Sequence, residues 1–256
     1  MKNSRQYRYQ VKSENLEKFL VCYKQSDLWI GIDKQSYQLI YPDLIYRKLV
    51  KLRHLFETHV AKYPDFKSSL TPIIPPADAE PMITHLYQLS EKVGVGPLAG
   101  IAGCFAQQIG EFIIKKLGGK QLIVENGGDI YINGKQTSQV LIFSQKSKLT
   151  HTFSIEITPD ITPCGVCTSS GKYGHSKNLG KADSVTVICG DAVMADLLAT
   201  ALSNEIKSAR DIEKVLEWSE KIDEIIFIAI IFNQHIGFRG KCNIYPLAQE
   251  GTSYAD

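Results

Sequence analysis

The chain has almost no excess of charge. Its 256 residues carry 29 Lys and Arg against 27 Asp and Glu, which leaves a formal net charge of +2. Binding to nucleic acid or to an anionic membrane surface requires clustered basic residues, and a balance near zero gives no reason to expect them. We therefore expect neither nucleic acid nor a membrane among the partners of this protein.

Long apolar runs are also scarce. The most apolar stretch, EIIFIAIIF from Glu224 to Phe232, is far too short to span a bilayer and predicts a buried strand. The N-terminal MKNSRQYRYQVKSENLEKFL lacks the apolar segment of a secretory signal peptide. Six scattered cysteines without an export signal indicate reduced thiols. These absences together favour a cytoplasmic location.

Strand-like and helix-like segments occur in clumps rather than in strict alternation, which favours an α+β fold over a doubly wound parallel sheet. FLVCY and LWIGI flank a polar turn and predict a hairpin, and Asn133-Gly134 predicts a second hairpin with a type I′ turn. The proline-rich stretch YPDFKSSLTPIIPPADAEP marks a candidate boundary near residues 64–80. Helices are expected over residues 42–63, 80–92 and 97–117, and after an N-cap at Asp191.

Two glycine-containing segments are candidate ligand loops. In ENGGD, adjacent glycines between two strands are typical of a tight turn, and they also let a backbone approach a ligand. In TSSGKYGH, backbone amides and hydroxyls could converge on an anion, although the spacing of a P-loop is absent. The candidate ligand-binding residues are Gly127, Gly128, Asp129, Thr168, Ser169, Ser170 and Gly171.

Asp196 and Thr200 carry the most informative spacing. At positions i and i+4 they share one face of a helix that is otherwise almost entirely apolar. A buried polar pair needs a partner, and a carboxylate with a hydroxyl offers two hard oxygen ligands for Mg²⁺. The alternative is a local hydrogen bond between the two side chains on an exposed helix face.

The CxxC of Cys164 and Cys167 lies in a segment, Cys164 to His175, that is expected to be a long loop. Zinc prefers four ligands, and only Cys189 and His175 could complete such a set. A redox pair would be expected to open a helix, which the following TSSGKYGH does not resemble. Two unpaired loop thiols are at least as good an interpretation as a metal or redox site.

Four segments, in order, resemble those of the ApbE-type flavin transferases, which move FMN from FAD onto a protein threonine with Mg²⁺. GIAGCFA (residues 100–106) resembles their G-I-A-K-G-Y-A helix, and NGGDI (residues 126–130) resembles their strand-end G-G-D. TSSGKYGH (residues 168–175) resembles their T-S-G-x-Y segment followed by a histidine, and ADLLATAL (residues 195–202) resembles A-D-A-L-A-T-A-L. The closest likeness is to a small, soluble branch of this superfamily.

The resemblance implies an α+β fold with tandem T-fold-like halves, in one domain over residues 1–256 whose motifs lie in a core at 94–206. It also implies FAD and Mg²⁺ as cofactors, with a flavin or related nucleotide as ligand, a protein acceptor and a potential homo-oligomer. Asp196, Thr200 and the Ala102 carbonyl would hold the metal, and His175 would lie near the pyrophosphate. His175, Asp196 and Cys167 are the candidate catalytic residues.

The chain also departs from the transferases. Gly103 stands where they have Lys, Gln108 stands where they have Asp, and HSKNLGKAD replaces their H-I-x-D-P-x-T-G. These changes fit a protein that binds a flavin or another phosphorylated ligand without transferring it. A rival hypothesis is sulfur assimilation, in which Cys167, with Cys164, carries a persulfide or acts as a redox thiol of lowered pKa beside Lys172. A non-catalytic flavin or nucleotide sensor is the third interpretation.

Overall fold

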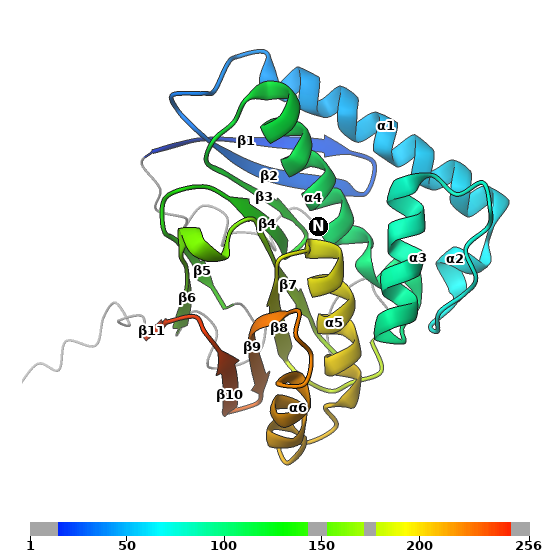
Figure 1. Cartoon of the computed structure of the whole chain (residues 1–256), viewed down its shortest axis with the longest axis vertical. Helices are drawn as coiled ribbons and strands as arrows, with labels where there is room; N and C mark the ends of the chain where they lie inside the picture. The colour runs from blue at the N-terminus through cyan, green and yellow to red at the C-terminus, as the bar shows by residue number, and fades with distance from the viewer. Residues whose placement is uncertain (1–14, 143–152, 172–177, 247–256) are drawn as a thin grey trace, which may run out of the picture.

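A large antiparallel sheet organises the computed structural model of the chain, which describes residues 15–142, 153–171 and 178–246. The order of its strands is β1-β2-β3-β4-β7-β8-β9-β10 (Figure 1). They are β1 (Leu16–Tyr23), β2 (Ser26–Asp33), β3 (Leu122–Asn126), β4 (Asp129–Asn133), β7 (Cys164–Ser169), β8 (Ser184–Cys189), β9 (Ile225–Phe232) and β10 (His235–Gly240). A smaller sheet, in the order β11-β6-β5, is formed by β5 (Ser138–Leu141), β6 (Phe153–Ile157) and β11 (Ile244–Pro246).

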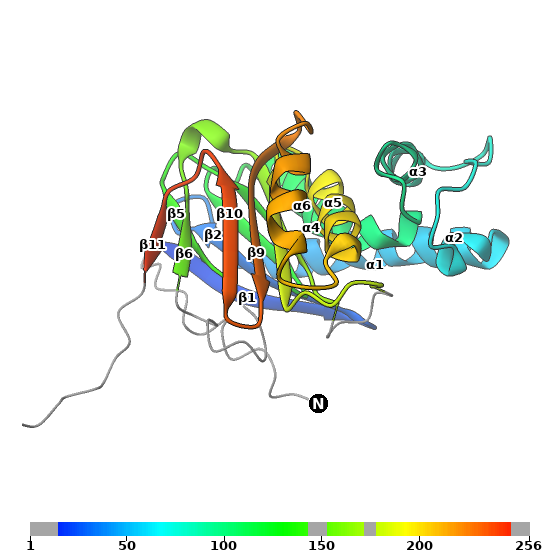
Figure 2. The ribbon, with the colours of Figure 1, turned by 90° about the horizontal axis from the view of Figure 1, so that it is seen from below.

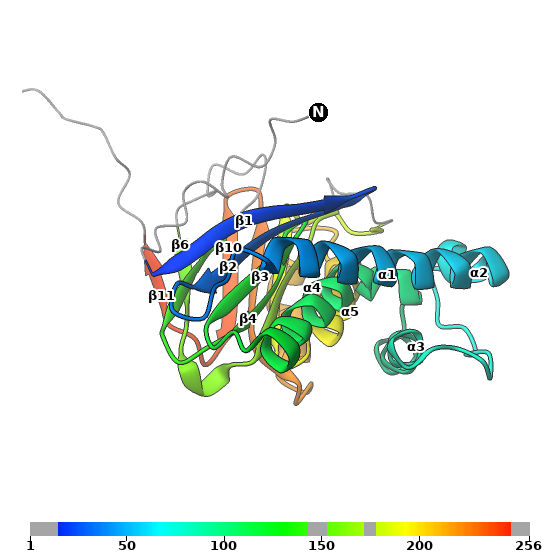
Figure 3. The same ribbon diagram turned by 90° about the horizontal axis from the view of Figure 1, so that it is seen from above.

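The helices gather on one face of the large sheet, and the small sheet covers the other (Figure 2). The helices are α1 (Tyr41–Lys62), α2 (Asp65–Ser68), α3 (Pro81–Val93), α4 (Ile101–Phe112), α5 (Ala192–Glu205) and α6 (Asp211–Ser219). A 3-10 turn (Pro97–Gly100) leads into α4, and a π-helical turn (Ile113–Leu117) continues it. Figure 3 shows α1 running along the β1–β2 end of the sheet. The α+β class predicted from the sequence is confirmed.

The three layers enclose two separate hydrophobic cores. The larger core lies between the helices and the large sheet, and it includes Leu49, Phe105 and Leu197. The smaller one lies between the two sheets and includes Ile155 and Phe227. Central strands such as β8 are therefore buried on both faces, and all six residues of β8 are buried. Residues before and after the proline-rich stretch, such as Leu49 and Leu86, contribute to the same larger core.

The tight turn between β3 and β4 is made by Gly127 and Gly128. Asn126 pairs directly with Asp129, so the hairpin loop has only two residues, and their φ angles are 72° and 112°. Positive φ at both loop positions is the geometry of a type I′ turn, and glycine adopts it without a steric penalty. The turn interpretation of NGGD is confirmed, and it places Asp129 at the first position of β4.

The hairpin predicted at Asn133-Gly134 is wrong. β4 pairs with β3 and β7, whereas the next strand, β5, belongs to the small sheet. Gly134 instead packs against the side chain of Gln121, where an added Cβ would lie 1.7 Å from its Oε1. The glycine is required there by a close contact rather than by a turn.

The segment Pro97–Leu117 is long and apolar enough to cross a membrane by length and composition alone. Half of its most apolar window is buried inside the protein. The helix α4 within it packs against β3, β4 and α5, and its Cys104, Phe105 and Ala106 belong to the larger core. This packing is that of a core helix, and it explains the apolar composition without a membrane.

Candidate functional site

The site is built on α5, the helix that crosses the middle of the large sheet beside α4 (Figure 1). Asp191 caps its N-terminus, because its Oδ1 accepts hydrogen bonds from the amides of Val193 and Met194 at 2.8 and 3.0 Å. This N-cap was predicted and is confirmed. Every residue of α5 from Ala192 to Ser203 is buried, so the polar side chains in its middle are held inside the protein.

Asp196 lies in this buried stretch with only 6% of its surface exposed. Its Oδ2 accepts a hydrogen bond of 2.9 Å from the amide of Gly103 on α4. Burial raises the pKa of the Asp196 carboxyl well above its ordinary value, and the negative charge of Asp129 raises it further. Backbone amides of Gly103 and Ala102 oppose this rise. The folded protein therefore holds a carboxyl group that ionises at a high cost.

Asp129 is the second buried carboxylate of the site, at the end of the two-glycine hairpin. Its Oδ1 accepts a hydrogen bond of 3.1 Å from the amide of Thr168 on the neighbouring β7. Burial raises the pKa of Asp129 to about 7, the charge of Glu125 adds to the rise, and the Thr168 amide opposes it. Within the described residues, no positively charged group is among those that shift the pKa of Asp129 or of Asp196.

Hydroxyl groups at the end of β7 approach α5 one turn beyond Asp196. The Thr200 hydroxyl donates a hydrogen bond to Ser169 Oγ at 3.4 Å, and both residues are buried. Thr168 points to the other side of the strand, where its hydroxyl shares a 2.8 Å hydrogen bond with Thr186 of β8. The Thr168 side chain therefore forms its hydrogen bond within the sheet, and its backbone amide is the group that binds Asp129.

The carbonyl of Ala102, at the start of α4, is joined to the β3–β4 hairpin by a hydrogen bond. It accepts a hydrogen bond of 3.1 Å from Asn126 Nδ2, on the strand that leads into the two-glycine turn. The adjacent amide of Gly103 is the donor to Asp196. One end of α4, the β3–β4 hairpin, the end of β7 and the middle of α5 are thus linked by hydrogen bonds into a single site.

The structure brings most of the predicted site residues together in this place. They are Ala102, Gly127, Gly128, Asp129, Thr168, Ser169, Asp196 and Thr200. Ser170 and Gly171 follow directly after Ser169, and the Gly171 amide donates to the carbonyl of Ala182. His175 lies outside the described residues. The loop expected from Cys164 to His175 is wrong for its first half, because Cys164–Ser169 forms the central strand β7.

Sequence reasoning missed three amide side chains. Asn126 binds the Ala102 carbonyl, and Asn178 donates to Ser169 Oγ at 2.8 Å. Gln107 binds the start of α5, since its Oε1 accepts from the amide of Ala192 at 2.7 Å. Only Asn126 carried a usable signal, because it immediately precedes the two glycines. Asn178 is nine residues from Ser169 and Gln107 is 85 residues from Ala192, and neither side chain belongs to a motif that predicts its partner.

Comparisons with known proteins identify the family and the fold of the chain. A family model described as AbpE bacteria matches residues 8–223. The chain belongs to this ApbE-like family. Relatives named UPF0280 protein come from Methanobrevibacter smithii, 36% identical over 75% of this chain and 83% of theirs, and from Methanococcus aeolicus, 34% identical over 78% and 82%. That name specifies no ligand and no reaction.

Solved structures of low sequence identity share the fold of this ApbE-like chain. The apo form of the flavinyl transferase ApbE from Pseudomonas stutzeri is similar with a TM-score of 0.57 and 14% identity, over 88% of this chain and 93% of that one. The ApbE protein of Thermotoga maritima is similar with a TM-score of 0.56 and 13% identity, over 88% and 97%. The large antiparallel sheet with its packed helices is therefore an ApbE-like architecture.

Gly103 of this ApbE-like protein occupies a place where no side chain fits. A Cβ there would lie 2.2 Å from the carbonyl oxygen of Ala192, the first residue of α5. From the opposite side, a Cβ on Gly165 of β7 would lie 2.2 Å from the Ala192 Cα. Two glycines therefore let α4 and β7 contact the backbone of α5 directly. The lysine that the transferases carry at the position of Gly103 cannot be accommodated without moving α5.

We expect Gly103→Ala to destabilise the protein by about 1–3 kcal/mol or more, because overpacking here pushes against backbone atoms. The measurement is the urea midpoint of unfolding. Gly190→Ala is the matched control, since an added Cβ at Gly190 meets nothing within 4 Å. Equal midpoints for the two variants would show that the α4–α5 contact is not tight.

Cys164 and Cys167 cannot act as a pair in this fold. They are three residues apart on one strand, so their side chains point to opposite faces of the sheet. Cys167 belongs to the larger core and Cys164 to the smaller one. Burial raises the pKa of Cys164 to about 12 and that of Cys167 well above its ordinary value, so the expected lowered thiol pKa is wrong. Neither thiol has the thiolate character that persulfide chemistry requires.

We expect a thiol reagent to label native protein rapidly at Cys22 alone, because it is the exposed cysteine of the six. Cys242 is partly buried and is expected to react more slowly, while the four buried cysteines react only after unfolding. Labelling with an aromatic disulfide reagent, followed by peptide mapping, measures this. The Cys22→Ser variant should lose the fast phase. Fast labelling of Cys167 would contradict the burial described above.

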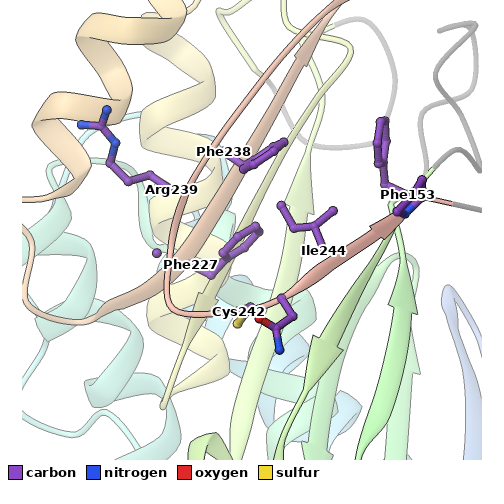
Figure 4. A pocket seen from close by; sticks show the side chains of 9 residues that line it. Phe153, Phe227, Phe238, Arg239, Cys242 and Ile244 are labelled. Carbon is purple, nitrogen blue, oxygen red and sulfur yellow. The ribbon is translucent and has the colours of Figure 1, made fainter.

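A separate cavity of about 550 Å³ lies between the free edges of the two sheets, away from this site. Figure 4 shows Phe153, Phe227, Phe238 and Ile244 around a common space. Arg239 contributes to its wall, but its guanidinium forms ion pairs with Glu213 and Glu220. The cavity is therefore lined mainly by apolar groups, and it shares no residue with the predicted ligand-binding set.

Proposed function

We propose that this protein binds FAD with the help of Mg²⁺ at the site formed by α4, α5, the two-glycine hairpin and the end of β7. The observation that carries the proposal is the pair of buried carboxylates, Asp129 and Asp196, whose pKa values are raised by burial and by negative charge. Such a pair costs free energy in the folded state unless a cation compensates it. A bound cation would remove that cost.

The donor set suits Mg²⁺ rather than a soft metal. Asp196 supplies a carboxylate, Thr200 a hydroxyl and Ala102 a carbonyl, all of which are hard oxygen ligands. Within the described residues, no three His, Cys, Asp or Glu side chains are arranged to hold a metal. Mg²⁺ usually keeps several waters and is completed by substrate phosphates, so it can bind with few protein ligands. We therefore expect cation and phosphate ligand to bind more tightly together than alone.

The hairpin glycines support the nucleotide part of the proposal. An added Cβ at Gly128 would meet nothing within 4 Å, so the turn presents bare backbone to open space. The amide of Gly128 is already used by Glu125 Oε1, at 2.7 Å, which holds the turn in place. A flat or phosphorylated ligand can approach such a turn closely. One of the solved ApbE structures is named a flavinyl transferase, and for this reason we propose a flavin as the ligand.

Transfer of FMN to a protein hydroxyl is the activity to test once binding is established. It would form a bond from the acceptor oxygen to the FMN phosphorus, release AMP and require a base for the hydroxyl proton. Asp129, whose pKa is raised by burial to about 7, is a described group that could hold that proton. The glycine at position 103 leaves this protein without the transferases' lysine, so we propose binding first and transfer second.

Calorimetric titration of the purified protein with FAD, with and without Mg²⁺, tests the proposal. We expect micromolar binding that depends on Mg²⁺, and weaker binding of FMN, which lacks the pyrophosphate. Absence of heat for FAD under both conditions would overturn it. Binding of FAD that is unaffected by a chelator would support the flavin as ligand and contradict the role of the metal.

A further inference from the structure

Ser169 is a buried hydroxyl whose two hydrogen-bond accepting positions are both occupied. Asn178 Nδ2 donates to its Oγ at 2.8 Å, and the Thr200 hydroxyl donates to the same oxygen at 3.4 Å. A serine hydroxyl has two acceptor positions and one donor proton. Only 6% of the surface of Ser169 is exposed. Even so, the described residues show no acceptor for the proton of its hydroxyl.

The direction of the Asn178 side chain follows from its other contact. Its Oδ1 accepts a hydrogen bond of 2.7 Å from the amide of Gly180. A backbone amide can only donate, so the oxygen of the Asn178 amide must lie on that side and its NH₂ group must face Ser169. The donor role of Asn178 toward Ser169 is thus fixed by the backbone of its own segment.

That segment is in turn fastened to the end of α5. The amide of Leu179 donates to Asn204 Oδ1 at 2.7 Å, and the amide of Lys181 donates to the carbonyl of Ile206 at 2.7 Å. At Gly180 a Cβ would lie 1.8 Å from the Ser203 carbonyl oxygen, so the two backbones are in contact. Asn178 is consequently held at a constant position relative to Thr200 and Ser169.

We propose that Asn178, acting through Ser169, makes this site selective for a phosphate oxygen that bridges to the bound cation. With both accepting positions filled, Ser169 can offer a ligand only its proton, so it recognises an acceptor. Thr200 uses its own proton toward Ser169, which leaves its lone pairs for a cation. A ligand oxygen that meets a hydroxyl donor on one side and a cation on the other is typically a phosphoryl oxygen. This inference rests on the proposed function and names Asn178 as a positioning residue.

The test is Asn178→Asp. An aspartate of the same shape can only accept, so the Ser169 proton turns toward it and is lost to the ligand. We expect the affinity for FAD in Mg²⁺, and for inorganic pyrophosphate in Mg²⁺, to fall about tenfold to a hundredfold, the effect of losing one hydrogen bond to a charged group. Ser169→Ala should cause a loss of the same size.

Asn204→Asp is the matched control. It introduces the same charge into the same fastened region, and its carboxylate can still accept from the Leu179 amide. We expect it to bind both probes within about threefold of wild type, allowing for the small effect of one partly exposed charge. An equal loss in Asn178→Asp and Asn204→Asp would assign the effect to charge and overturn the proposal.

The double variant Ser169→Ala/Asn178→Asp separates positioning from a structural role. If Asn178 acts only through the Ser169 hydroxyl, Asn178→Asp has no further effect on affinity once that hydroxyl is gone. Additive losses would overturn the proposal, as would wild-type affinity in Ser169→Ala, a variant that remains informative if Asn178→Asp does not fold. Wild-type protein that binds neither probe in Mg²⁺ would instead refute the proposed function itself.

Discussion

Asp196→Asn is expected to abolish Mg²⁺-dependent binding of FAD while leaving the protein as stable as wild type or more stable. The amide oxygen of asparagine can still accept from the Gly103 amide, so the hydrogen bond that joins α4 to α5 is retained. The buried negative charge is removed, and with it both the cost of ionising Asp196 and its attraction for a cation. We expect at least a hundredfold loss of FAD affinity in Mg²⁺, on the scale of losing a charged ligand.

Calorimetry and thermal unfolding of the same samples measure the two effects. A loss of binding together with a lowered melting temperature would show damage to the fold, whereas a loss at constant or higher stability identifies a ligand. Thr200→Val and Thr200→Ser form a second pair on the next turn of α5. Serine keeps the hydroxyl and should bind FAD within a few-fold of wild type, whereas valine should not. Unchanged Mg²⁺-dependent binding by Asp196→Asn would show that the Asp196 carboxylate does not bind the cation.

Much of the framework of the site could be predicted from local sequence. The Asp191 cap, the helix after it and the i, i+4 spacing of Asp196 and Thr200 depend on neighbours within two helical turns, and the structure confirms that helix. The two-glycine turn is equally local, because φ is positive at both positions. Local rules succeeded where the interactions themselves are local.

The sequence predicts a loop where strand β7 lies, because this strand is in the middle of three layers. A strand covered on both faces has no alternation of apolar and polar residues, and the small residues of CGVCTS are typical of loops as well. Its glycine, Gly165, is there for contact with Ala192 of α5, some distance away in the sequence. The sequence alone does not reveal which element approaches a glycine so closely.

The partners of the site hydroxyls were also out of reach of sequence reasoning. Asn178 and Ser169 are nine residues apart, and Ser169 and Thr200 are 31 apart. Their donor and acceptor roles depend on a backbone amide, that of Gly180, which fixes the direction of one side chain. The resemblance to the transferases located the region, but only the fold shows which groups use up which hydrogen-bonding positions. The cytoplasmic location, the protein acceptor and the homo-oligomer stay predictions.

Without Mg²⁺, the protein is expected to lose stability as the pH rises through about 7, and Asp129 is expected to be a main cause. Its pKa is raised from 3.8 to about 7 in the folded state. A group that binds its proton more tightly when folded contributes stability that is present below its unfolded pKa. That contribution is lost as the pH rises from about 4 through about 7. Each pH unit within this range costs about 1.4 kcal/mol.

Urea unfolding at pH 5 and pH 7.5 of wild type and Asp129→Asn measures the contribution of this carboxyl. Other groups titrate over the same range, so the informative quantity is the difference between the two proteins. Relative to wild type, Asp129→Asn should gain about 2 kcal/mol between the two pH values in the absence of Mg²⁺. Asp160→Asn, at an exposed position, should show no such gain. Because a cation favours the ionised carboxylates, Mg²⁺ with FAD should reduce the gain in Asp129→Asn. If the difference in unfolding free energy between the two proteins is the same at both pH values, Asp129 is excluded as the titrating group.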